Sequence, residues 1–183
     1  EALCAYLLLA GNAYIEAVTV EGSFMHQDGR TQLRSININP PDASGVRPEP
    51  EVGTVSQLES TGRLESNRLT MNVSYRIPST RTMLGTFYVL SSTKNHADSP
   101  LSLPADSRNP DAEWGPAALD VRHRIFTMFN FPLPKGMRGN IMSQAQSGLP
   151  YTITPGRDDN GDGVSNDRPA GVGIVTPDLG VRR

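Results

Sequence analysis

The sequence lacks most of the features by which small proteins are classified at once. It has one cysteine, Cys4, which excludes an internal disulfide and a cysteine-based zinc site. No apolar run reaches about 18 residues, so no segment qualifies as a transmembrane helix. The net charge is −2, whereas a general nucleic-acid binder carries a basic footprint. With 37% hydrophobic and 20% charged residues in 183, the composition alone indicates a soluble, loop-rich protein.

Arrangements of catalytic residues are lacking as well. The three histidines, His26, His96 and His123, are scattered and form no His-x-x-x-His pair for zinc. The sequence contains no Gly-x-Ser-x-Gly elbow, no phosphate-binding loop and no dinucleotide fingerprint. A hydrolase interpretation fails because no nucleophile and base can be named together. We therefore expect no enzymatic activity.

The clearest positive signal is a strict alternation of side chains. Residues 68–77 (RLTMNVSYRI) place apolar side chains at odd positions and polar side chains at even positions. Such a pattern predicts a β-strand with one apolar and one wet face. Residues 78–81 supply a short turn, and residues 82–93, which are rich in β-forming residues, follow it. The two segments are predicted to form a β-hairpin.

A second hairpin is predicted from residues 119–131 and 138–147, which are joined by a turn rich in proline and glycine. In the first of these segments the odd positions are mainly apolar, and Arg122 and Arg124 occupy even positions. His123 falls on the apolar parity, so we expect a structural role for it. Weaker strand signals cover residues 3–10, 14–24, 32–38 and 151–154.

The connections between the predicted strands alternate in length. Short turns fall near 11–13, 78–81 and 132–137, and long polar connections near 39–65, 95–118 and 155–183. Every second connection is long, which places all long loops at one end of an up-and-down sheet. This layout is typical of outer-membrane β-barrels, whose strands cross the bilayer with about 9–11 residues. A soluble antiparallel sandwich has strands that alternate in the same way, and the pattern alone leaves both architectures open.

Several short motifs occur in a fixed order along the chain. They lie at residues 120–124 (DVRHR), 131–134 (FPLP), 146–152 (QSGLPYT) and 158–171 (DDNGDGVSNDRPAG), with weaker ones at 37–41, 67–69 and 88–91. From about residue 13 to 175 the ordered set resembles the C-terminal barrel half of TonB-dependent receptors. The Oar-like group, which carries a carboxypeptidase-regulatory-like domain at its N-terminus, is the most similar type.

The resemblance implies an all-β fold of antiparallel up-and-down hairpins. They form part of a transmembrane outer-membrane β-barrel with long extracellular loops, in a Gram-negative-type bacterium. The implied function is a share in the energy-coupled uptake of a large substrate. The implied partners are outer-membrane lipid, the rest of the barrel and its plug, TonB acting through that plug, and an unidentified substrate. No nucleic-acid partner is expected.

The number of predicted strands also bears on domain organisation. About six strands are fewer than the eight that the smallest barrels need, so residues 1–183 are predicted to be a partial barrel domain. The sequence shows no plug domain, no TonB box and no closing aromatic strand. Because transport in the family depends on such parts, the resemblance assigns no transport residue to this chain.

The sharpest local signal is an acidic loop that follows the predicted strands. Asp158, Asn160 and Asp162 alternate and Gly163 follows them, as at positions 1, 3, 5 and 6 of a calcium loop. Ca²⁺ prefers hard oxygen ligands, and the glycine permits the sharp turn that brings them together. The carbonyl of Val164 stands at position 7 and is expected to supply the next oxygen.

The loop departs from an EF-hand at its far end. Position 12 is Pro169 rather than glutamate, so Asn166 or Asp167 has to supply the last side-chain oxygen. The candidate calcium ligands are Asp158, Asn160, Asp162, Val164 and Asp167. The competing interpretation is a solvated turn, because Asp, Asn and Gly are also the commonest turn residues. A second function class follows from the loop, namely a soluble cell-surface calcium-binding β-rich adhesion module.

Overall fold

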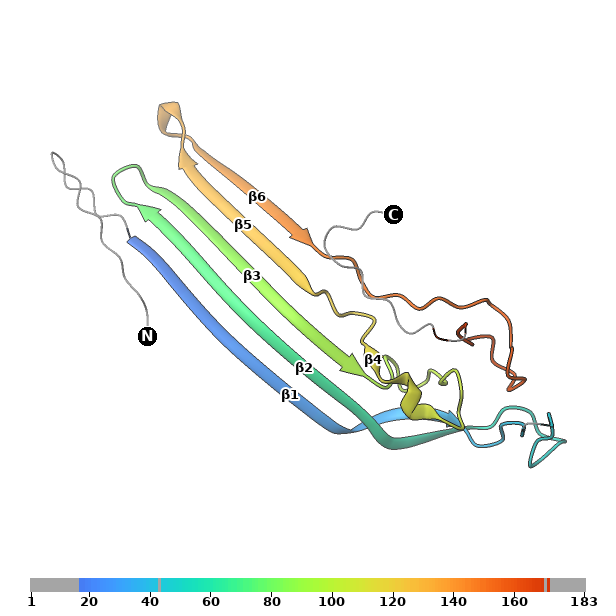
Figure 1. Cartoon of the computed structure of the whole chain (residues 1–183). Coiled ribbons are helices and arrows are strands. Elements are labelled where there is room, and N and C mark those ends of the chain that lie inside the picture. Colours follow the sequence, from blue (N-terminus) through green and yellow to red (C-terminus); the bar gives the residue numbers. More distant parts are fainter. Residues whose placement is uncertain (1–16, 43, 170, 172–183) are drawn as a thin grey trace. The chain divides into compact units, whose positions relative to one another are not determined.

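The computed structural model describes residues 17–42, 44–169 and 171. The elements are β1 (Ala17–Asn37), β2 (Ser56–Ile77), β3 (Thr82–Asn95), η1 (Pro110–Glu113), β4 (Gly115–Pro116), β5 (His123–Pro132), η2 (Pro134–Gly136) and β6 (Arg138–Gln146). Strands make up nearly all the regular structure (Figure 1). Within the described residues, no helix is both long enough and apolar enough to cross a membrane.

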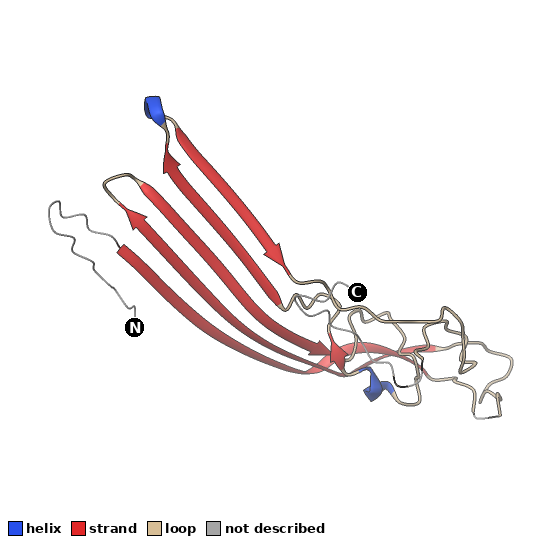
Figure 2. Cartoon of the chain, turned by 45° about the horizontal axis from the view of Figure 1, so that its top comes forward, coloured by secondary structure: helices blue, strands red, loops and turns tan. Residues whose placement is uncertain are grey.

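The strands form one sheet in which neighbours along the chain are neighbours in space. The order is β1-β2-β3-β5-β6, and the two-residue β4 pairs with β3 beside this path. The pairings of β3 with β4, of β3 with β5 and of β5 with β6 are antiparallel. Figure 2 shows the long strands joined by short turns at one end and by long connections at the other. A sandwich needs a second sheet, and the described residues contain none.

The short turns depend on residues that accept unusual backbone angles. In the turn between β2 and β3, Arg81 adopts a φ of 55° and its N–H donates to the Pro78 carbonyl at 3.3 Å. Between β5 and β6, Gly136 adopts a φ of 75°, and the Leu133 N–H donates to the Met137 carbonyl at 2.9 Å. Glycine reaches positive φ without strain, so Gly136 suits the second turn, whereas Arg81 adopts such an angle with a side chain.

The chain divides into two compact units. Unit 1 contains, of the described residues, 17–25, 68–91 and 121–147, and unit 2 contains all the others. In unit 1, β5 has 10 residues and β6 has 9. These lengths match the roughly 9–11 tilted residues with which a β-strand crosses a bilayer.

The register within unit 1 defines two faces of the sheet. Paired residues such as Leu84 with Phe129, and Phe129 with Ile141, share a face. Face A is defined by Leu84, Thr86, Tyr88, Leu90, His123, Ile125, Thr127, Phe129, Phe131, Gly139, Ile141, Ser143 and Ala145. Face B is defined by Met83, Gly85, Phe87, Val89, Arg124, Phe126, Met128, Asn130, Pro132, Arg138, Asn140, Met142, Gln144 and Gln146. Every arginine, asparagine and glutamine in this register lies on face B.

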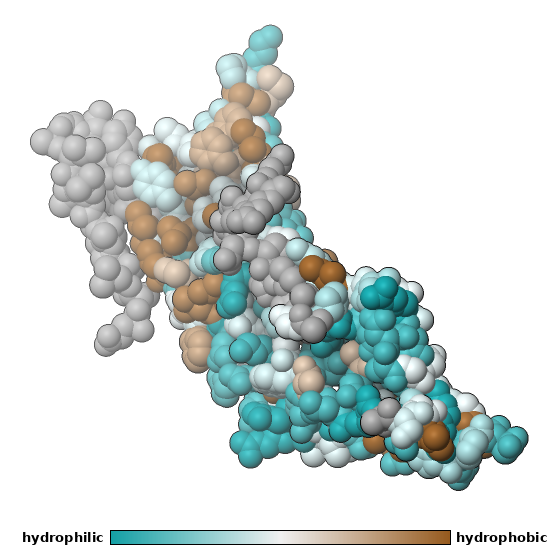
Figure 3. Space-filling model, turned by 45° about the vertical axis from the view of Figure 1, so that its right-hand side comes forward, coloured by the Kyte–Doolittle hydropathy of each residue, from teal (hydrophilic) through white to brown (hydrophobic). Residues whose placement is uncertain are grey.

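Large apolar side chains of unit 1 are open to their surroundings rather than packed in a core. On face A, Leu84 is 37% exposed, Ile125 40% and Ile141 56%. Among the described residues of the whole chain, the buried hydrophobic side chains are only Ala117 and Val121. Figure 3 shows apolar residues gathered in one region of the surface and polar residues in another. Such exposure is unfavourable in water, and it is expected where lipid covers the strands.

Unit 2 holds its long connections together with polar contacts. Its buried polar residues include Arg34, Asn37, Asn39, Ser66, Asn95, Ser107, Asp120, Asp162 and Asp167. Asn39 illustrates the principle, because its side-chain amide donates to the carbonyls of Glu49, Val52 and Gly53 at 2.7–3.0 Å. Buried polar groups are stable only when they are hydrogen-bonded. The long connections are therefore built structures with their own polar interior.

Both hairpins predicted from the sequence are present in the sheet. The hairpin of 68–77 and 82–93 is confirmed, since β2 ends at Ile77 and β3 begins at Thr82. The second hairpin is confirmed with a later start, because β5 begins at His123 rather than at 119. There the Asp120 N–H donates to the Ala117 carbonyl at 2.9 Å, which makes a turn where a strand was expected.

The remaining expectations hold only in part or lie outside the described residues. The segment 32–38 is the end of the continuous β1, and the connection expected at 39–65 ends earlier because β2 begins at Ser56. The expected extension at 151–154 is reduced to a single bridge at Tyr151. The segment 3–10, the turn at 11–13 and the start of 14–24 lie outside the described residues.

Candidate functional site

The acidic loop folds around its own backbone N–H groups. The Asp158 carboxylate accepts the N–H of Asp162 at 3.1 Å and the N–H of Gly163 at 2.8 Å. Gly161 and Gly163 adopt positive φ angles of 73° and 88°, which reverse the chain at these points. The loop is thereby curled so that successive side-chain oxygens turn inward.

The remaining candidate ligands belong to the same hydrogen-bonded cluster. The Asn160 Oδ1 accepts the Asp162 N–H at 2.8 Å, and the Asp162 Oδ1 accepts the Val164 N–H at 2.8 Å. The Asp167 carboxylate accepts the N–H groups of Asp159 and Asn160 at 2.6 and 3.2 Å, and the Asn160 side-chain amide at 2.9 Å. The structure therefore brings all five sequence-predicted residues into one loop.

Two oxygen atoms of the loop are buried without a donor. They are the Asp162 Oδ2 and the Asn166 Oδ1. Asp162 is only 4% exposed, and burial raises the pKa of its carboxyl above the usual value. The negative charges of Asp158 and Asp167 raise that pKa further, although the Val164 N–H opposes the effect. A buried carboxylate oxygen without a partner carries the full cost of its lost hydration.

The carboxylates of the loop do not form a metal site on their own. Among the described residues, no group of three or more His, Cys, Asp or Glu side chains is placed to hold a metal ion. Several carboxylate oxygens of Asp158 and Asp167 face backbone N–H groups instead. Any cation here has to be held by a mixture of carboxylate, amide and main-chain oxygens.

The loop is attached to two other long connections of unit 2. The Asn160 amide donates to the Ala105 carbonyl at 2.7 Å, and the Asn166 amide donates to the Leu103 carbonyl at 2.9 Å. From the connection between β1 and β2, the Thr54 hydroxyl donates to the Asp162 carbonyl at 3.0 Å. The conformation of the acidic loop therefore determines how three separate segments are held.

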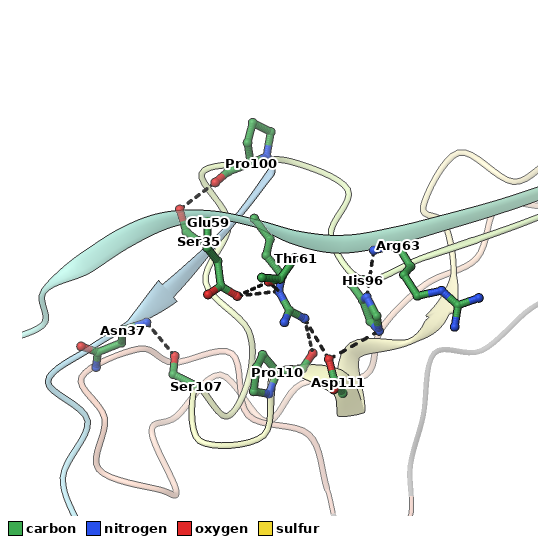
Figure 4. A network of polar contacts seen from close by, with 11 residues as sticks. Ser35, Asn37, Glu59, Thr61, Arg63, His96, Pro100, Ser107, Pro110 and Asp111 are labelled. Atoms are coloured by element: carbon green, nitrogen blue, oxygen red, sulfur yellow. Dashed lines mark hydrogen bonds and ion pairs between the residues drawn. The ribbon is translucent and has the colours of Figure 1, made fainter. Parts of the chain in front are cut away.

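A second polar network in unit 2 is centred on Arg34, which sequence reasoning missed. Its Nε donates to Glu59 at 2.9 Å and to Thr61 at 2.8 Å, and its terminal nitrogen donates to Asp111 at 3.2 Å. Figure 4 shows these partners converging from β2 and η1. The Thr61 hydroxyl also bonds Glu59 and lowers its pKa, and the Arg34 guanidinium lowers it further. An isolated arginine gives no pattern in the sequence, so no signal pointed to this network.

His96 lies beside this network, at the end of the β3 region. Its Nδ1 accepts the Arg63 N–H at 3.0 Å, and its ring meets Trp114 edge-on with centroids 5.1 Å apart. The Arg63 guanidinium stands 5.2 Å from the centroid of the same Trp114 ring. Burial lowers the pKa of His96, and the charge of Arg34 lowers it further. The Asp111 carboxylate, whose Oδ1 lies 3.9 Å from the His96 Nε2, opposes this lowering of the pKa.

Unit 2 is expected to lose stability in mild acid because of His96. The unfolded chain binds a proton at His96 near the ordinary pKa of about 6.5, whereas the folded unit binds it only at lower pH. Because the pKa of His96 is lower in the folded state, this residue stabilises the fold at pH values above its unfolded-state pKa. The contribution is lost as the pH falls toward its folded-state pKa. Asp111, Glu113, Arg34 and Arg63 surround the ring and set the folded value.

The measurement is hydrogen exchange of residues 93–115 in the complete protein between pH 7.5 and 5, corrected for intrinsic exchange rates. His96→Asn is the matched variant, because its amide oxygen is able to accept the Arg63 N–H without titrating. Protection should fall with pH in the unmodified protein and stay nearly constant in the variant. Parallel pH profiles in the two proteins would contradict the role of His96.

A small polar cavity adjoins the same residues of unit 2. It encloses about 120 Å³ and is lined by Arg34, His96, Glu113 and Arg168, among others. Arg168 forms an ion pair with Glu113, and its Nε is buried without an acceptor. The cavity has room for a few water molecules, and one of them is well suited to accept from this nitrogen.

Unit 1 carries a different electrostatic feature at its short turns. A groove of about 560 Å³ is lined by Arg76, Arg81 and Arg138, together with Asn130 and Phe131. Among the described residues of unit 1, Glu21 is the only acidic side chain. The described part of unit 1 is thus strongly cationic, and the two arginines of the β3–β5–β6 register, Arg124 and Arg138, lie on face B.

Comparison with known proteins agrees with the fold and these surfaces. Residues 15–181 match the family of outer membrane beta barrel domains. No curated protein and no solved structure matches the chain significantly. The match covers nearly the whole chain and accounts for strands of membrane-crossing length, for one face without charge and for the scarcity of a buried apolar core. The chain belongs to the family of outer membrane beta barrel domains, and its location is the outer membrane.

Proposed function

We propose that the chain is a segment of the barrel of a TonB-dependent receptor of the Oar-like type, which takes up a large substrate by energy-coupled transport. In this proposal face A contacts lipid and face B lines the barrel interior. The ordered motifs that resemble this group carry the proposal. Membership of the outer membrane beta barrel family is compatible with it and does not by itself distinguish a transporter from other barrels.

The positions of the motif residues support the proposal. The Tyr88 hydroxyl lies 2.7 Å from the His123 Nδ1. The Ser147 N–H donates to the His123 carbonyl at 2.9 Å, and the His123 N–H donates to the Ser147 hydroxyl at 3.2 Å. Three residues from three separate motifs therefore meet at one level of unit 1, across β3, β5 and the end of β6. Because residues of these motifs contact one another, their occurrence in this order is more specific evidence for a relationship to the group.

The composition of face B also supports a barrel that is filled by protein. Phe87 pairs with Phe126, and Met128 pairs with Met142, on the same face as Arg124 and Arg138. An open aqueous pore is lined mainly by polar side chains. Large apolar side chains among arginines are better explained by a surface that contacts another folded part, as a plug inside the barrel provides.

The test is binding of the complete outer-membrane protein to the periplasmic domain of TonB. We expect binding of the purified protein in detergent, and its loss when the segment preceding the plug is deleted. The parent reading frame should encode a plug upstream and an aromatic-ended strand downstream. Absence of TonB binding together with absence of a plug would leave a barrel without energy coupling and would refute the transport proposal.

The soluble adhesion module is the weaker alternative. It needs face A to be buried against a second sheet, and the described residues contain a single sheet with face A exposed. Membership of the outer membrane family also argues against it. A monomer that stays soluble without detergent would support the alternative. The acidic loop is common to both proposals and does not distinguish them.

A further inference from the structure

The acidic loop contains more negative charge than its surroundings neutralise. Among the described residues, no ion pair reaches Asp158, Asp162 or Asp167. Arg157 pairs with Asp159 at 2.7 Å and Arg108 pairs with Asp106 at 3.0 Å. Arg47 reaches the loop, but its guanidinium donates to the Gly161 carbonyl at 3.4 Å rather than to a carboxylate. Like charges held close together in a buried site oppose each other's ionisation. In the described part of the chain, the three aspartates therefore have Arg47 and Arg108 nearby but no cationic side chain in ion-pair contact.

Independent of charge, the two donor-less oxygens indicate which kind of partner is missing. The Asp162 Oδ2 and the Asn166 Oδ1 both lack a hydrogen-bond donor. Asp162 as a whole is only 4% exposed. Both atoms are hard oxygen acceptors. A water molecule is able to satisfy one or two acceptors, but it leaves the charge of the three aspartates in place. A divalent cation satisfies both requirements at once.

We propose that the loop binds one Ca²⁺ ion through Asp158, Asn160, Asp162 and the Val164 carbonyl, with Asp167 as the closing acid. These groups are oxygen donors at alternate positions of a tightly curled loop, as calcium loops require. In the structure, Asp167 holds the Asn160 amide and backbone, so it fixes the orientation of one ligand even before it contacts the ion.

Gly163 makes the curl of the loop possible. Its φ is +88°, and a Cβ at this position would lie 2.9 Å from the Thr54 hydroxyl and 3.3 Å from the Arg47 guanidinium. A side chain would therefore push the connection between β1 and β2 away from the loop. The close approach explains why a glycine stands where a calcium loop also needs one.

Calcium at this loop acts as a clamp for the long connections of unit 2. The ion fixes the Asn160 side chain, whose amide donates to the Ala105 carbonyl, and the Asp162 backbone, whose carbonyl accepts from the Thr54 hydroxyl. Its binding should therefore order segments far from the loop in the sequence. This property does not depend on transport, because it concerns only how the external connections are held.

The first experiment measures Ca²⁺ binding to the complete protein in detergent by isothermal titration calorimetry after removal of divalent ions with EDTA. We expect one site with a Kd of about 10⁻⁴–10⁻³ M, the range of extracellular calcium modules. Asp162→Asn should weaken binding at least about tenfold, because it removes a charged ligand. Asp159→Asn is the matched control, since Asp159 pairs with exposed Arg157, and its Kd should change less than about twofold.

The second experiment keeps the proposal testable if a variant folds poorly. Hydrogen exchange of the unmodified protein is compared with Ca²⁺, with Mg²⁺ and with EDTA. Ca²⁺ should protect residues 103–105 and 158–166 together, and Mg²⁺ should not. In EDTA, Asp162→Asn should protect the loop better than the unmodified sequence, because the substitution relieves repulsion among the aspartates. No binding up to about 10 mM Ca²⁺, or equal affinity in Asp162→Asn, would overturn the proposal.

Discussion

Replacing Ile141 with arginine should destabilise the barrel by about 2–4 kcal/mol, the cost of an arginine on the lipid side of a barrel near the bilayer midplane. Ile141 lies near the middle of β6, on face A, where it pairs with Phe129 and is 56% exposed. In lipid this exposure is favourable for isoleucine and unfavourable for a guanidinium. The free energy of unfolding of the complete protein in bilayers, measured by denaturant titration, checks the result.

The matched control is the adjacent residue on the other face. Asn140 pairs with Asn130 on face B, which also carries Arg124 and Arg138. Asn140→Arg should cost less than about 1 kcal/mol, because face B is turned away from lipid and already carries arginine. Equal destabilisation by the two substitutions would mean that the faces are not sorted between lipid and barrel interior.

Replacing Arg34 with methionine should destabilise unit 2 by about 2–4 kcal/mol, somewhat below the cost of breaking a fully buried ion pair. The Arg34 side chain is 9% exposed and its partner Glu59 is 21% exposed. Methionine fills much of the same volume but leaves Glu59 and Asp111 without their cation. The network links β1, β2 and η1, so hydrogen exchange should accelerate in all three segments at once.

Arg30→Met provides the control for this substitution. Arg30 lies four residues earlier in β1, its side chain is 79% exposed, and it pairs with Asp28 at 2.8 Å. Exposed ion pairs contribute little, so the variant should unfold at the same denaturant concentration as the unmodified protein. A similar effect of both substitutions would show that charge in general, rather than the buried network, stabilises unit 2.

The sequence predicts the parts of this fold that the membrane environment imposes. The hairpin of 68–77 and 82–93 was identified because lipid on one face and a wet interior on the other require alternation. The same reasoning found β5 and β6, and the strand register places His123 and Arg124 on the opposite faces that the parity indicated. Alternation is a local signal, and it is visible wherever two different solvents act on one strand.

The sequence did not predict the segments that have the same kind of environment on both faces. Residues 56–65 belong to β2 but lack alternation, because they lie in unit 2, whose interior is polar. The Arg34 network joins residues up to 77 positions apart in the sequence, and no spacing rule reveals such a pairing. The acidic loop is recognisable from the sequence because its candidate oxygen ligands are neighbours along the chain. Its attachment to Thr54 and Ala105 is not.

The most direct test of the central claim uses nitroxide labels at Asn72 and Val73, neighbours in β2 of unit 1. Each residue is replaced by cysteine in a Cys4→Ser background of the complete protein, which is then reconstituted in lipid vesicles. The label at Val73 should collide with oxygen dissolved in lipid, and the label at Asn72 should be reached by a water-soluble nickel reagent. Equal accessibility at the two positions would contradict the assignment of these strands to a membrane-spanning barrel wall.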